Sequence, residues 1–171
     1  EPGTKQSDTD ILNQLALSYQ GRNHTGDHLL AIETYEKCIA LKPVKFEPMV
    51  NLGVLYTETN MIEKAKSIYD QALLLAPKSP VLLNNVAHLY LTADDDSGDG
   101  KYLKAYNLSS LAFQLMPDHH AIKTTYQRAL VGMGDYYFKL KNFTNALGWY
   151  YKAPRIQAAL PDVLEKIIKT H

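Results

Sequence analysis

Oxygen-bearing side chains gather in residues 94–100, where they could hold a metal ion. Asp95, Ser97 and Asp99 match positions 1, 3 and 5 of a calcium-binding loop, and Gly follows at position 6. The bidentate Glu that such a loop needs at position 12 is Tyr106 instead. We therefore interpret this insert as a solvated loop and expect no metal there.

Histidine and cysteine are the other residues that could do chemistry. His24 and His28 could share a transition metal, but a clear third ligand is missing. Cys38 occupies a small-residue position of a helical pattern, which indicates a buried and inert thiol. No Ser or Cys stands in a pattern with a base and an orienting group. We expect no catalytic residue, no cofactor and no metal, and hence a protein that is not an enzyme.

Charge and hydropathy exclude two further classes of partner. The chain has 171 residues, with 18 Lys and Arg against 18 Asp and Glu, so its formal net charge is zero. Without an excess of positive charge, the general attraction to nucleic acid is missing. No apolar run approaches the roughly 18 residues of a membrane-spanning helix. We expect a soluble domain that binds no nucleic acid and does not insert into a membrane, and we leave its compartment open.

An internal repeat dictates the elements that must position any site. Three pairs of landmarks are separated by 34 residues: Ala31 and Ala65, Pro43 and Pro77, and Tyr56 and Tyr90. Small residues and tyrosines recur at fixed offsets between them, such as Gly53 before Tyr56 and Ala65 before Tyr69. A fixed period in this range is typical of stacked helix-turn-helix units.

These residues and spacings resemble the tetratricopeptide repeat family over about residues 9 to 153. The resemblance implies an all-α fold, a right-handed superhelix of about four helix-turn-helix repeats. The predicted parts are a polar N-terminal tail at 1–8, four units at 9–45, 46–79, 80–117 and 118–153, and a C-terminal capping helix at 154–171. The capping helix is predicted because Leu160, Leu164, Ile167 and Ile168 recur at helical spacing.

Departures from a regular repeat locate turns and helix ends. The fourth unit has seven extra residues, which we place before its first helix as added turns from about Asp118 to Tyr126. Ser79 followed by Pro80 predicts a helix start, and Asn60 with Glu63 resembles a capping box.

In this family the first helices of successive repeats line a concave groove, so the resemblance implies a protein or extended peptide ligand. An amide stands at the sixth position of three units, as Gln14, Asn51 and Asn85, and Gly132 replaces it in the fourth. Amides could hydrogen-bond a peptide backbone, or they could bond a neighbouring helix. The predicted partner-binding residues are Asn13, Gln14, Asn51, Val54, Asn85, His88, Leu91, Asp135 and Phe138.

Some relatives clamp a terminal carboxylate with basic residues, but Asn13 and Val50 stand where those would be needed. We interpret Arg128 and Lys139 of the fourth unit as solvated charges.

The predicted function is a non-enzymatic protein-interaction scaffold that supports assembly of a complex. Two alternatives remain open. The first is a structural or self-association module of a larger chain, with a possible homo-oligomer. The second is a glycan-recognising module attached to an enzyme system. It would use aromatic residues that the repeat does not require: Tyr102, Tyr106, Trp149 and Tyr151.

Overall fold

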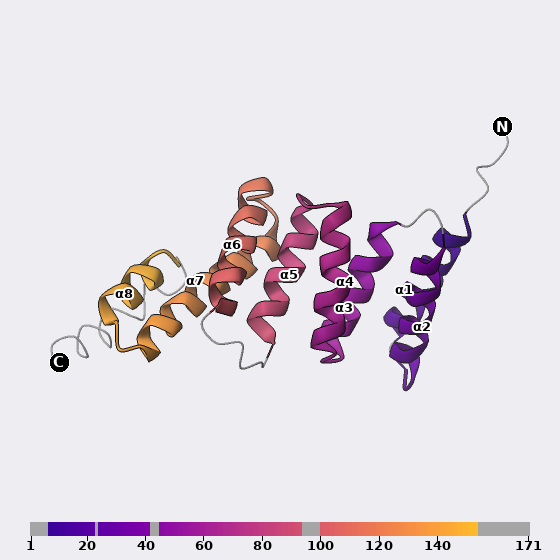
Figure 1. Ribbon diagram of the computed structural model, residues 1–171, viewed down its shortest axis with the longest axis horizontal. Helices are drawn as coiled ribbons and strands as arrows, with labels where there is room; N and C mark the ends of the chain where they lie inside the picture. The colour runs from indigo at the N-terminus through magenta and orange to yellow at the C-terminus, as the bar shows by residue number, and fades with distance from the viewer. Residues whose placement is uncertain (1–6, 23, 42–44, 94–99, 154–171) are drawn as a thin grey trace. The chain divides into compact units, whose positions relative to one another are not determined.

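The computed structural model describes residues 7–22, 24–41, 45–93 and 100–153, and these ranges fold as helices joined by short turns (Figure 1). The predicted capping helix at 154–171 and most of the insert at 94–100 lie outside the described residues. The chain divides into two compact units, residues 1–77 and residues 78–171.

The first unit holds two helical hairpins. They are built from α1 (Asp8–Arg22), α2 (Asp27–Ala40), α3 (Phe46–Glu58) and α4 (Ile62–Leu75). Helix α1 packs on α2, α2 on α3, and α3 on α4. Gly53 of α3 lies against the buried ring of Tyr69 on α4, so that a Cβ at Gly53 would overlap the ring. The small residue at this repeat position therefore allows close helix packing.

An ion pair between Arg22 and Asp27 closes the turn between α1 and α2. The Arg22 guanidinium donates to both carboxylate oxygens of Asp27, at 2.5 and 2.9 Å, and the backbone N–H of His24 donates to the same carboxylate at 2.8 Å. The hydrogen bond from Arg22 is the main reason why the pKa of Asp27 falls to about 2. Asp27 is therefore a structural residue at the start of α2.

The second unit holds α5 (Pro80–Thr92), α6 (Gly100–Leu115), α7 (His120–Lys139) and α8 (Phe143–Tyr151). Helix α5 packs on both α6 and α7, α6 packs on α7, and α7 packs on α8. The Gly53–Tyr69 contact of the first unit has its counterpart here, because Gly134 of α7 lies under the Tyr150 ring of α8. The same packing rule thus operates in both units.

Two predictions about helix starts have opposite outcomes. Ser79 caps α5 as expected, since its Oγ accepts from the N–H of Leu82 at 3.4 Å and Pro80 stands in the first turn. The capping box at Asn60 is wrong. Asn60 adopts a left-handed backbone with φ 59°, and Met61 precedes α4 without a side-chain cap. A left-handed residue ends α3 tightly, which is a role that Asn tolerates better than most residues.

The added turns of the fourth unit are confirmed. Helix α7 begins at His120 and runs for 20 residues, whereas α3 and α5 have 13 each. Tyr126 in these turns stacks on Phe113 of α6, with ring centroids 4.9 Å apart and an interplanar angle of 11°. The extension of α7 is therefore held against α6 by aromatic contact.

Candidate functional site

The predicted amide row is in part committed to contacts inside the first unit. The Nδ2 of Asn51 on α3 donates to Oδ1 of Asn13 on α1 at 3.3 Å. Gln14 is exposed on α1, and Val54 is half-buried one turn beyond Asn51. The contact matches the alternative in which an amide bonds a neighbouring helix, so Asn51 links two repeats whatever else it binds.

In the second unit, α5 carries the next predicted residues. Asn85 accepts from Nδ2 of its neighbour Asn84 at 3.4 Å, and the buried Oδ1 of Asn84 has no hydrogen-bond partner within the described residues. His88 and Leu91 follow at helical spacing and are half-buried. Leu91 and Asp135 of α7, both predicted partner-binding residues, line the same pocket.

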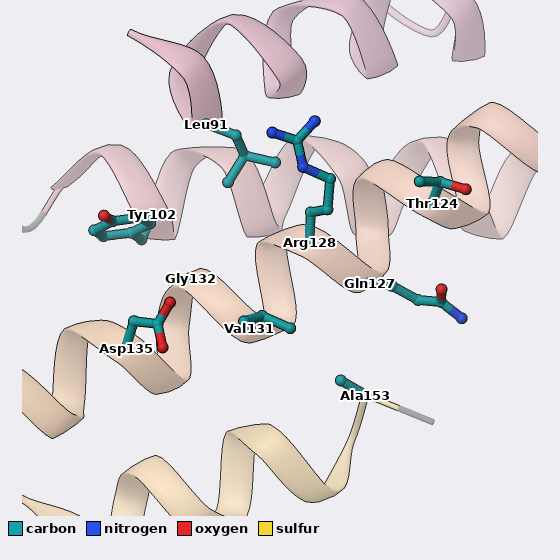
Figure 2. A pocket seen from close by; sticks show the side chains of 9 residues that line it. All are labelled: Leu91, Tyr102, Thr124, Gln127, Arg128, Val131, Gly132, Asp135 and Ala153. Carbon is teal, nitrogen blue, oxygen red and sulfur yellow. The ribbon is translucent and has the colours of Figure 1, made fainter. Parts of the chain in front are cut away.

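That pocket has a volume of about 380 Å³ and lies wholly within the second unit (Figure 2). We name it the α7 pocket, because most of its wall comes from that helix. Its described lining residues are Leu91, Tyr102, Thr124, Gln127, Arg128, Val131, Gly132, Asp135 and Ala153.

Gly132 explains why the amide row stops in the fourth unit. A Cβ on Gly132 would lie 2.6 Å from Cδ1 of Tyr102, whose ring comes from α6. Any larger residue would push the ring away from α7. Glycine at this position therefore allows Tyr102 to form part of the pocket beside Leu91 and Val131 (Figure 2).

Two of the described lining residues carry formal charge, Arg128 and Asp135. Asp135 accepts a hydrogen bond from the Tyr150 hydroxyl at 2.6 Å. Burial, and then this bond to a carboxylate, raise the pKa of Tyr150 well above its usual range, so the phenol stays protonated near neutral pH. Arg128 is exposed, and within the described parts of the chain it forms no ion pair.

The sequence offered signals for some of these residues. Gly132 breaks the row of amides, and Tyr102 is a tyrosine that the repeat does not require. Thr124, Gln127 and Ala153 carried no signal. Phe138, a predicted groove residue, does not line the pocket; its ring meets that of Phe143 on α8, with centroids 5.4 Å apart.

Two of the other aromatic residues, Tyr106 and Trp149, contact each other. The Tyr106 ring meets the Trp149 ring edge-on, with centroids 4.9 Å apart, and the Lys152 ammonium lies 4.0 Å from the Trp149 centroid. The Lys152 ammonium thus lies over the Trp149 ring, on which a sugar ring would stack. Tyr102 lies in the α7 pocket instead of in this cluster.

A smaller hollow of about 250 Å³ lies in the first unit among α2, α3 and α4. Polar groups in this hollow contact one another. The Tyr56 hydroxyl donates to Glu36 at 2.6 Å, and the Lys64 ammonium lies 5.5 Å from the centre of the Tyr56 ring. In the α7 pocket, by contrast, Arg128 has no ion-pair partner among the described residues. The α7 pocket is therefore the stronger candidate for a ligand site.

Solved structures and a family pattern identify the fold. The chain aligns with a thermophilic TPR protein from Thermus thermophilus at a TM-score of 0.60 and 14% identity, covering 95% of this chain and 97% of the other. It aligns with a tetratricopeptide repeat protein from Parabacteroides merdae ATCC 43184 at a TM-score of 0.63 and 22% identity, covering 95% of this chain and 60% of the other. The tetratricopeptide repeat pattern matches residues 9–45 and 46–79.

The chain contains two tetratricopeptide repeats, at residues 9–45 and 46–79, and its fold is similar to that of solved tetratricopeptide repeat proteins. Its fold class, an all-α superhelical repeat fold, is confirmed by these matches. Tetratricopeptide repeats bind proteins, so the family supports a role in protein–protein interaction. In the described part of the chain, none of the helices is long and apolar enough to cross a bilayer.

A curated relative adds a biological context. Photosystem I assembly protein Ycf3 of Synechococcus sp. (strain CC9311) is 30% identical over 103 residues. The match spans 54% of this chain and 60% of the relative's length.

Proposed function

We propose that this chain is a non-enzymatic scaffold that binds a segment of a protein partner in the α7 pocket and thereby supports assembly of a complex. The observation that carries the proposal is the pocket itself. It combines the apolar side chains of Leu91, Tyr102 and Val131 with the polar side chains of Thr124, Gln127, Arg128 and Asp135. Apolar surface with a few placed polar groups is the usual composition of a recognition site.

The similarity to an assembly protein supports the assembly part of the proposal. The groove residues outside the pocket, including Asn51 and Asn85, stay predictions as further partner contacts. Asn51→Ala together with Asn85→Ala tests them, because unchanged partner affinity in the double variant would remove the amide row from the binding site.

Blocking the pocket tests the main proposal. Gln127→Trp places a bulky side chain at the pocket edge, whereas Lys123→Trp adds the same bulk on an exposed part of α7 that does not line the pocket. Partners are captured on the wild-type chain, and their affinities for the purified variants are measured by calorimetry. We expect at least a tenfold loss for Gln127→Trp alone. Equal affinities for both variants would refute the pocket as the binding site.

Self-association is a second candidate, favoured by an exposed apolar line on α6. Leu103, Leu111 and Leu115 recur at multiples of four residues, with 49%, 40% and 44% of their surface exposed. Light scattering after size exclusion tests it. A dimer that Leu111→Glu with Leu115→Glu converts to a monomer would support self-association, and a wild-type monomer across concentrations would refute it.

A further inference from the structure

The two charges of the α7 pocket have a defined spacing. Arg128 and Asp135 are seven residues apart on one helix, which is about two turns and roughly 10 Å along the axis. Figure 2 shows both side chains leaving α7 on the side of Leu91 and Tyr102. The cation and the carboxylate therefore stand at the two ends of one apolar surface.

Arg128 and Asp135 do not pair with each other within the described residues. A salt bridge needs an N–O separation within about 4 Å, and no described carboxylate pairs with the Arg128 guanidinium. At the other end, the Tyr150 hydroxyl fixes the orientation of the Asp135 carboxylate. The pocket thus presents one positive and one negative group in a set order.

The turns added at the start of α7 lie next to Arg128, the positively charged residue of the pocket. Thr124 belongs to the added turns of α7, and Gln127 and Arg128 follow directly. Tyr126 stacks on Phe113 at 4.9 Å and lies 6.1 Å from Tyr106, both measured between ring centroids. Aromatic packing on α6 therefore holds the turn from which Arg128 projects.

We propose that the α7 pocket selects an extended partner segment that carries an acidic and a basic side chain three residues apart. The acidic group binds Arg128, and the basic group binds Asp135. An extended polyproline-type segment rises about 3.1 Å per residue with three residues per turn, so positions i and i+3 lie on one side about 9 Å apart. That separation matches the roughly 10 Å axial spacing of Arg128 and Asp135 on α7, and Leu91, Tyr102 and Val131 contact the aliphatic parts between them.

This inference rests on the proposed function of the pocket, and peptide titrations separate the two. The probes are capped hexapeptides with cores Glu-Pro-Leu-Lys, Lys-Pro-Leu-Glu, Gln-Pro-Leu-Gln and Lys-Pro-Leu-Lys, added to the ¹⁵N-labelled full chain and followed by NMR. The two mixed-charge cores cover both chain directions. We expect the better of them to bind about fivefold more tightly than the neutral core, with the largest shifts at residues 124–135.

Charge reversal supplies the decisive control. Arg128→Glu should abolish the preference for the mixed-charge core and should favour Lys-Pro-Leu-Lys, whereas Lys123→Glu, the same charge change outside the pocket, should leave the preference intact. Pocket binding without regard to charge overturns this inference and leaves the proposed function standing. If none of the peptides shifts the pocket resonances, both the charge preference and the pocket as a peptide site are overturned.

Discussion

Replacing Gly53 with Ala tests the close packing of α3 on α4. The new Cβ would lie 2.6 Å from Cζ and 2.7 Å from Cδ1 of the Tyr69 ring, whereas ordinary contacts are 3.4–4 Å. The ring must therefore move by roughly 1 Å, although only 1% of the Tyr69 surface is exposed and little space is available.

The magnitude follows from two opposing terms. Overpacking a filled core costs about 1–3 kcal/mol. Replacing Gly by Ala inside a helix returns about 1 kcal/mol through helix propensity. We expect a net loss of about 0–2 kcal/mol in the free energy of unfolding of the first unit.

The assay is urea unfolding followed by far-UV circular dichroism. Gly21→Ala is the matched control, because Gly21 is a helical residue of the same unit and a Cβ there meets nothing within 4 Å. The control should gain about 0.5 kcal/mol. In a Tyr69→Leu background the cost of Gly53→Ala should largely disappear. Equal stability of the Gly53 and Gly21 variants, with no coupling to Tyr69, would refute the packing argument.

Three further changes test local features. The pKa of Asp27 is lowered to about 2 in the folded chain, so its contribution to stability is complete above the unfolded value of 3.8 and is lost as the pH falls from about 4 to 2. Asp27→Asn should therefore flatten the plot of unfolding free energy against pH in that range. An unchanged slope would contradict a stabilising Arg22–Asp27 ion pair. Asn60 has a positive φ, which Gly adopts freely and Val does not. Asn60→Gly should preserve or raise the melting temperature, whereas Asn60→Val should lower the free energy of unfolding by about 1–2 kcal/mol. Equal stabilities of the two variants would show that the left-handed backbone is not what selects Asn at this position. Ser79→Ala should lower the unfolding free energy by about 0.5–1 kcal/mol through loss of the cap on α5, and Ser79→Thr should retain most of it.

The period of the sequence predicted the helical hairpins because the packing of one repeat on the next depends on residues at regular intervals. Gly53 with Tyr69 and Gly134 with Tyr150 are pairs of this kind, and each is a contact in the structure. The extra residues before Tyr126 were also readable, since an insertion of seven residues fits about two helical turns.

The α7 pocket was less predictable. Arg128 was interpreted as a solvated charge; it is exposed in the structure, and it also lines the pocket. For Asn51 the sequence left a peptide contact and a bond to a neighbouring helix both open, and the structure contains the bond to Asn13. Asn60 was assigned to a cap, but its backbone is left-handed, because the tight end of α3 decides its conformation. Local patterns do not report which side chains a neighbouring helix already occupies.

The amino-acid sequence by itself determined the repeat, the helix pairs and the family, because these depend on spacing along the chain. Only the tertiary structure decided that Leu91, Tyr102 and Arg128 share a pocket, because they come from three different helices. Where such side chains meet depends on how the helices pack in space, and a linear period carries no record of it.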